Sequence, residues 1–113
     1  MNNLEDTVHF GLFVEEDLVS IASLYKEPLK EKDDLNGWQL RAMATLPAFQ
    51  GNGYGSKLLE SCIKLVKEKA GNYIWCNARI KAVDCYKRFG FEVISDEFEI
   101  PGIGLHYMMM LKT

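Results

Sequence analysis

The sequence has no apolar run close to the roughly 20 residues that cross a bilayer, and its first six residues are acidic and polar. We therefore expect a cytoplasmic protein without a membrane segment. A long run of Lys or Arg is also lacking, and 13 basic against 16 acidic residues give a net charge of −3. Because binding to a phosphate backbone depends on clustered cations, nucleic acid is not an expected partner.

Cysteine is scarce and irregularly spaced. The three cysteines, Cys62, Cys76 and Cys85, include no C-x-x-C pair. An odd number without close spacing fits neither a disulfide framework nor a structural zinc site. We expect reduced and mostly buried side chains that act as small hydrophobic residues, and no metal centre.

What is present is the composition of an ordinary folded domain. The chain has 113 residues, of which 48% are hydrophobic and 26% charged. That length suffices for one hydrophobic core but not for two, so residues 1–113 are expected to form a single domain.

Hydrophobic periodicity predicts six strands and two helices. The predicted strands cover residues 8–14, 18–25, 38–45, 73–77, 91–94 and 105–111, and the predicted helices cover 56–70 and 81–89. Residues 26–37 and 95–104 are expected to be connections, and Gly71 is expected to cap the first helix in a left-handed conformation. Hairpins at both ends with helical crossovers between them imply an α/β (α+β) domain with a mixed sheet.

Residues 50–55 form a glycine loop, Gln-Gly-Asn-Gly-Tyr-Gly, between a predicted strand and a predicted helix. Unpaired amides at a helix start, together with the positive end of the helix dipole, favour an anion such as a pyrophosphate. Glycines at 51, 53 and 55 permit positive φ and remove Cβ atoms that would keep a phosphate away. The loop matches neither the dinucleotide fingerprint nor the nucleotide P-loop, and a tight turn without a ligand remains an alternative.

Two segments resemble the GNAT superfamily of N-acetyltransferases. Residues 44–55, Ala-Thr-Leu-Pro-Ala-Phe-Gln-Gly-Asn-Gly-Tyr-Gly, resemble its acetyl-coenzyme A signature, a strand ending in x-P-x-x-[QR]-x-x-G-x-[GA] before a long helix. Residues 78–91 resemble its A-x-x-x-Y-x-x-x-G-F segment, and the two together cover roughly residues 38–94. Residues 102–106 resemble a G-I-P-H-like stretch of small members, with Gly104 in place of the proline and Leu105 inserted.

The resemblance implies a mixed, mostly antiparallel sheet that is splayed in the middle. It receives the pantetheine arm of acetyl-coenzyme A between the strand at residues 41–45 and the strand at residues 73–77. Backbone groups near residue 45 would bind that arm and polarise the acetyl carbonyl, and the glycine loop would bind the pyrophosphate. The residues expected to contact the coenzyme are Ala44, Thr45, Leu46, Gln50, Gly51, Asn52, Gly53, Tyr54, Gly55 and Arg79.

The implied activity is transfer of acetyl from acetyl-coenzyme A to a primary amine by direct attack, without a metal. By the same resemblance Tyr86 is the expected acid, because a phenol keeps its proton until the thiolate departs. The candidate bases are Glu15, Glu16, Glu97, Glu99 and His106. The acceptor is a small-molecule or peptide amine. The alternatives are a non-catalytic module that binds acyl-coenzyme A and a plain scaffold domain.

The chain departs from the family pattern at its start. Typical members place a strand and one or two helices before the first hairpin, where they form a wall of the acceptor site, whereas only seven residues precede Val8 here. The acceptor site is then shallow and open, or a second subunit supplies the wall, or catalysis has been lost. Together with the methionines at 108–110, the short start motivates the hypothesis of a homodimer.

Overall fold

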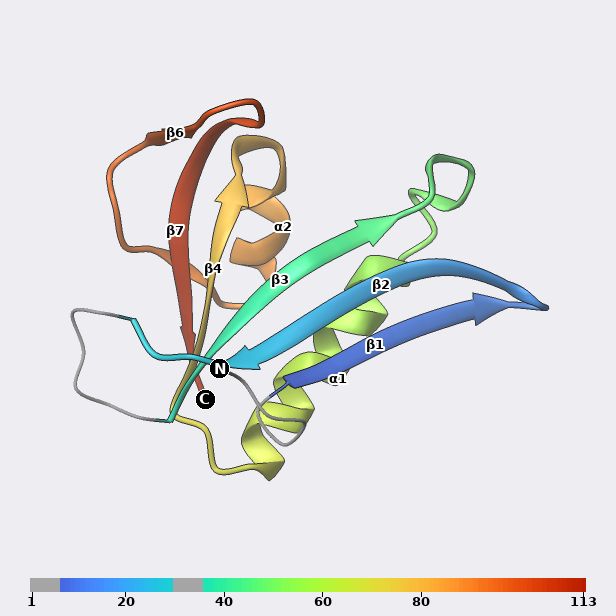
Figure 1. The fold of residues 1–113 in the computed structure, drawn as a ribbon, viewed down its shortest axis with the longest axis horizontal. Coiled ribbons are helices and arrows are strands. Elements are labelled where there is room, and N and C mark those ends of the chain that lie inside the picture. Colours follow the sequence, from blue (N-terminus) through green and yellow to red (C-terminus); the bar gives the residue numbers. More distant parts are fainter. Residues whose placement is uncertain (1–6, 30–35) are drawn as a thin grey trace.

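The structure is a computed structural model that describes residues 7–29 and 36–113 (Figure 1). The strands are β1 (Thr7–Val14), β2 (Asp17–Lys26), β3 (Gly37–Thr45), β4 (Tyr73–Arg79), β5 (Glu92–Val93), β6 (Phe98–Ile100) and β7 (Gly104–Lys112). The helices are α1 (Tyr54–Glu68) and α2 (Val83–Arg88), with short 3-10 turns η2 (Pro47–Phe49) and η3 (Ile80–Ala82).

All seven strands belong to one sheet. Its order is β1-β2-β3-β4-β7-β5, and β6 also pairs with β7. Every pair is antiparallel except β3 with β4, which are parallel and joined through the α1 crossover. The predicted fold class, a mixed and mostly antiparallel sheet with flanking helices, is confirmed.

The core lies between one face of this sheet and the two helices. In β2 and β3, alternate side chains such as Ala22, Leu24 and Leu40 are buried on the face that α1 covers. α1 contributes an apolar stripe at three- and four-residue spacing, namely Leu58, Leu59, Cys62 and Val66. The opposite face, which we call the outer face, carries the intervening side chains of β3 and β4.

The centre of the sheet is a fork. β3 and β4 are in register only at Gly37 with Tyr73, Trp38 with Ile74, and Gln39 with Trp75. Beyond these pairs β3 continues along β2 and β4 continues along β7, so the two strands diverge (Figure 1). The splay predicted between these strands is therefore present, and it begins after Gln39.

Close packing at the base of the fork explains why residue 71 is a glycine. A Cβ atom on Gly71 would lie 2.5 Å from Val66 Cγ1 and 2.9 Å from Trp38 Cδ1, so a side chain does not fit there. The predicted left-handed cap is displaced by one residue, because it is Ala70 that has a positive φ of 57°. The glycine is needed for close approach to Trp38, which is 2% exposed.

β3 contains a β-bulge beside the fork. Ile21 pairs with Ala44 and Ser23 with Arg41, so Ala42 and Met43 together face the single residue Ala22. Ala42 takes a φ of 54°, which a non-glycine residue adopts only at some cost in energy. A bulge bends its strand and redirects side chains, and here it directs Met43 toward α2.

The other differences from the sequence prediction lie at element ends and in one missed strand. α1 begins at Tyr54 instead of residue 56, and the second helix is split into η3 and the shorter α2. β6 lies within the predicted connection 95–104, where it forms a hairpin with β7. Of the predicted loop 26–37, residues 30–35 lie outside the described residues.

Candidate active site

The fork has two arms, the β3 arm, in which β3 continues along β2, and the β4 arm, in which β4 continues along β7. The two arms carry different parts of the predicted site. The β3 arm holds the bulge and leads through η2 and the glycine loop into α1. The β4 arm leads through η3 into α2, which carries Tyr86. In Figure 1 the glycine loop and the tip of β4 lie on opposite sides of the opening between the arms. The glycine loop and Tyr86 are therefore carried by different arms of the fork.

The glycine loop has the conformation that exposes backbone amides. Gly51 and Gly53 have φ of 83° and 79°, and a Cβ atom on either would meet nothing within 4 Å. Gly53 is the N-cap of α1, and it supplies no side-chain cap to the first turn, which also contains no acidic residue. The first-turn amides of α1 thus lack the usual capping partner, and the positive end of a 15-residue helix faces the loop.

Two side chains among the expected coenzyme contacts, Gln50 and Asn52, fix the shape of the loop. Gln50 Nε2 donates a hydrogen bond of 3.1 Å to the Thr45 carbonyl, and Asn52 Nδ2 donates one of 3.2 Å to the Phe49 carbonyl. Both hydrogen bonds lie within the β3–α1 connection. They hold the loop against the end of β3 before any ligand arrives, which lowers the entropy cost of binding.

The end of β3 is tied to β2 by Ser20. Its hydroxyl donates to the Ala44 carbonyl at 3.2 Å and shares a 2.8 Å hydrogen bond with Thr45 Oγ1. The Leu46 amide donates to the Val19 carbonyl at 2.9 Å. That amide is therefore committed to β2.

Tyr86 bridges the two arms. Its hydroxyl donates to Met43 Sδ across the fork at 3.6 Å, and its ring packs edge-on against Phe91 with centroids 5.2 Å apart. The residue is only 9% exposed. Burial raises the pKa of Tyr86 well above the ordinary value, and the neighbouring thiols of Cys76, Cys85 and Cys62 raise it further. Tyr86 is therefore a neutral donor at any physiological pH.

The cysteines around Tyr86 are free thiols. Cys62 and Cys76 are buried, and Cys85 is half-buried on α2. Burial raises the pKa of Cys62 and of Cys76 to about 12. Because the thiolate is the reactive form, these two residues are inert at neutral pH and serve as core residues, as predicted.

Arg79 and His106 occupy facing positions on β4 and β7. Arg79 is exposed where β4 ends. His106 is 3% exposed, and its ring stacks on Phe98 with centroids 6.0 Å apart. Nδ1 lies 2.8 Å from the Gly104 carbonyl. Since a carbonyl only accepts, Nδ1 donates the proton in this hydrogen bond.

The acidic candidates are spread over the molecule. Glu15 and Glu16 lie in the exposed β1–β2 turn, at the end of the hairpin away from β6 and β7 (Figure 1). Glu97 accepts a hydrogen bond of 3.4 Å from the Tyr107 hydroxyl, and Glu99 is exposed on β6. The structure therefore does not bring the five candidate bases together.

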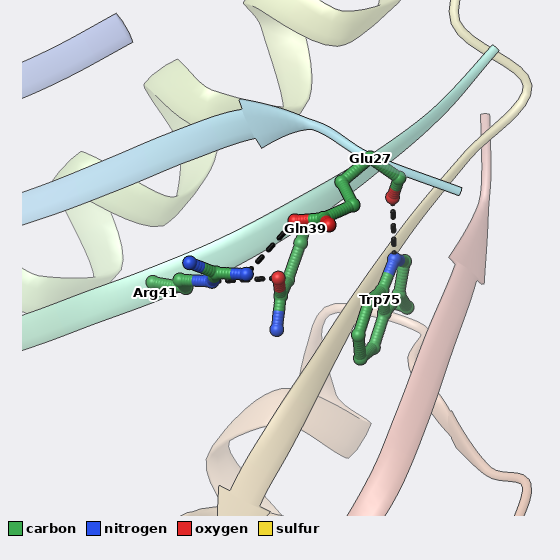
Figure 2. A network of polar contacts seen from close by, with 4 residues as sticks. All are labelled: Glu27, Gln39, Arg41 and Trp75. Carbon is green, nitrogen blue, oxygen red and sulfur yellow. Dashed lines mark hydrogen bonds and ion pairs between the residues drawn. The ribbon is translucent and has the colours of Figure 1, made fainter. Parts of the chain in front are cut away.

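A polar network on the outer face was not predicted (Figure 2). Arg41 donates from Nε to Gln39 Oε1 at 2.6 Å and forms an ion pair with Glu27 Oε2 at 2.8 Å. Its guanidinium also lies 4.7 Å from the centre of the Tyr25 ring, and Trp75 Nε1 donates to the Glu27 carbonyl at 2.8 Å. The network joins three chain segments where the fork opens. The alternation of Gln39 and Arg41 around the buried Leu40 is the sequence signal that indicates it.

Within residues 7–29 and 36–113, no three His, Cys, Asp or Glu side chains are placed to hold a metal ion. In the same part of the chain, no helix is both long enough and apolar enough to cross a membrane.

Comparison with known proteins agrees with this geometry. The model of the Acetyltransferase (GNAT) domain family matches residues 1–112. The uncharacterized N-acetyltransferase YitI of Bacillus subtilis (strain 168) is 32% identical over 112 residues, which cover 99% of this chain and 74% of that protein.

Solved structures share the fold. The crystal structure of Escherichia coli ElaA superimposes with a TM-score of 0.79 at 21% identity, covering 93% of this chain and 68% of that one. An aminoglycoside 6′-N-acetyltransferase crystallised with coenzyme A superimposes with a TM-score of 0.80 at 12% identity, covering 96% of this chain and 74% of that one.

Proposed function

The chain belongs to the GNAT acetyltransferase family and transfers acetyl from acetyl-coenzyme A to an amine, and we propose that the reaction occurs inside the fork with Tyr86 as the acid. The observation that carries this proposal is the contact between Tyr86 on one arm and Met43 on the other. A buried, neutral proton donor that faces the opposite arm supports the proposal that Tyr86 protonates the sulfur released by a thioester lying in the fork.

The coenzyme is proposed to bind along the β3 arm. Its diphosphate would accept hydrogen bonds from the amides of residues 51–55, with Gln50 and Asn52 holding the loop in position. Its pantetheine arm would pair with backbone groups of Ala44 and Thr45, on the edge of β3 that has left β4. Arg79 on the other arm would contact the coenzyme from the opposite side.

In the proposed reaction the neutral amine attacks the thioester carbonyl, and the carbon–sulfur bond breaks as the new carbon–nitrogen bond forms. The amine loses one proton and the departing sulfur gains one. Tyr86 supplies the proton to the sulfur, and its high pKa keeps it protonated until that step. Among the candidate bases we propose His106, whose ring is held in one orientation by the hydrogen bond between Nδ1 and the Gly104 carbonyl.

The amine is proposed to approach from the outer face. The helices occupy the other face, since Tyr86 and the apolar stripe of α1 belong to one buried cluster. Glu27 and Arg41 are about half exposed on the outer face at the fork. Both small-molecule and peptide amines remain candidate acceptors, and a panel that measures free-thiol release with each class would distinguish them.

A cytoplasmic location and a homodimer are further parts of the proposal. The free cysteines support a reducing compartment. The exposed apolar side chains of Phe13, Leu18 and Ile21 on the β1–β2 hairpin support self-association. Light scattering at micromolar concentration tests the dimer, and a monomeric mass would refute it.

Coenzyme binding is tested with a matched pair of glycine variants. Gly53 and Gly102 have φ of 79° and 82°, and a Cβ atom at either position would meet no atom within 4 Å. Alanine therefore introduces similar backbone strain at both sites, but only Gly53 lies in the proposed diphosphate loop. We expect Gly53→Ala to weaken acetyl-coenzyme A binding in calorimetry by about tenfold or more, the cost of a lost charge-assisted hydrogen bond.

Gly102→Ala should bind the coenzyme as the unaltered protein does. Equal binding by both variants would contradict the proposed loop. Binding without any thiol release across the amine panel would instead indicate the non-catalytic module.

A further inference from the structure

We infer that Met43 sets the size of the acyl group that this enzyme accepts, an inference that rests on the proposed role of Tyr86. The starting observation is the 3.6 Å contact between the Tyr86 hydroxyl and Met43 Sδ. It places the end of the methionine side chain at the atom that must meet the thioester sulfur.

The bulge in β3 accounts for this position of Met43. Regular alternation after Leu40 places Ala42 on the buried face and Met43 on the outer face. The extra residue of the bulge, with Ala42 at a positive φ, reverses that alternation locally. Met43 consequently packs against the buried cluster that contains Tyr86. The strained backbone at Ala42 is thus used to turn one large, flexible side chain into the fork.

The two sulfur atoms compete for one proton. A phenol carries a single O–H donor, and in this structure Met43 Sδ accepts its hydrogen bond. The thioester sulfur can accept the Tyr86 proton only if Met43 gives up that contact. The methionine side chain is unbranched and adapts its shape readily, so it can move aside while remaining beside the reaction centre.

The displaced side chain then borders the acyl group. The acyl carbonyl carbon is bonded directly to the sulfur that meets Tyr86, so the acyl chain begins within a few ångströms of Met43. Phe91 packs against the Tyr86 ring and limits the space on the β4 arm. On the β3 arm the Tyr86 hydroxyl contacts Met43, so Met43 borders the acyl group from that side. An acetyl group fits beside it, whereas a longer acyl group must displace the methionine further.

The test compares the binding of acetyl- and butyryl-coenzyme A by calorimetry, which needs no knowledge of the amine. The readout is the ratio of the butyryl Kd to the acetyl Kd. For the unaltered protein we expect a ratio well above one. Met43→Ala removes Cγ, Sδ and Cε, and we expect it to lower the ratio about tenfold, since one methylene in an apolar pocket changes discrimination by about tenfold or more.

Three further variants separate side-chain size from other effects. Met43→Leu keeps most of the volume and should keep the ratio within about twofold. Met43→Val removes less volume than alanine and should give a smaller change in the same direction, which keeps the test decisive if Met43→Ala does not fold. Met110→Ala removes a half-buried methionine from β7 and should leave the ratio unchanged.

An unaltered protein with a ratio near one would overturn the inference. So would a folded Met43→Ala or Met43→Val variant that binds acetyl-coenzyme A with the original ratio. A protein that binds neither thioester overturns the proposed function itself, and the inference with it. The two failures are therefore distinguishable in one experiment.

Discussion

Replacing Tyr86 by phenylalanine removes one hydroxyl from the centre of the proposed reaction. The ring of Tyr86 is buried and keeps its edge-on contact with Phe91 in the variant. The hydroxyl donates only to Met43 Sδ at 3.6 Å among the described residues, and a thioether is a weak acceptor. We therefore expect the free energy of unfolding to change by less than about 1 kcal/mol.

The expected effect on turnover is much larger. A positioned general acid contributes about 10²–10⁴-fold to a rate, which corresponds to about 3–5 kcal/mol of activation free energy. In the proposed complex the loop and the backbone at the end of β3 supply most of the contacts to the coenzyme, so its Kd should change by less than about threefold. The loss should be constant between pH 7 and 9, because the raised pKa keeps Tyr86 protonated throughout this range.

The assay combines thiol release at saturating acetyl-coenzyme A with urea unfolding and calorimetry on the same samples. Tyr107→Phe is the matched control, because it removes another hydroxyl, one that donates to Glu97 at 3.4 Å on β7. This control should keep its turnover within about twofold. A Tyr86→Phe enzyme with turnover within threefold of the unaltered protein would refute the role of Tyr86.

Three more outcomes follow from the packing and the burial of ionisable groups. Gly71→Ala should lower the free energy of unfolding in urea by about 1–3 kcal/mol, because its Cβ atom would overlap Val66; an unchanged midpoint would contradict this. Burial raises the pKa of Cys62 and Cys76 from 9.0 to about 12, so thiols of the unfolded chain ionise first as pH rises. The stability that these neutral thiols contribute is complete below pH 9 and should disappear as pH rises through 12. In a Cys62→Ala, Cys76→Ala double variant, the free energy of unfolding should therefore decline less steeply over this pH range. Trp75→Phe should reduce stability by about 0.5–1.5 kcal/mol by removing the hydrogen bond to the Glu27 carbonyl; no loss in urea unfolding would show that water replaces that bond.

Much of the fold could be predicted from residue patterns because the central elements are strongly periodic. The alternation in β1 and the apolar stripe of α1 predicted those elements to within two residues. The sequence also predicted where the sheet splays, through the family resemblance. β6 was missed because Phe98–Ile100 is only three residues long, too short for a reliable alternation signal.

Tertiary contacts decided the features that local patterns did not predict. The sequence predicted Gly71 as a helix cap, but residue 71 is glycine because Trp38 and Val66 leave no room for a side chain there. Met43 looked like one more residue of a regular strand, and only the bulge turns it toward Tyr86. The Arg41 network depends on Glu27 from a connection whose position the sequence does not specify.

The fork also puts the exposed loops of the molecule on two different arms. The glycine loop and the bulge lie on the β3 arm, whereas α2 and the exposed turn after β6 lie on the β4 arm. In the sheet, the arms are joined through three residue pairs of one parallel ladder. The exposed turn between β6 and β7 lies outside the buried cluster that joins the arms, so an insertion there is expected to leave the geometry of the glycine loop intact.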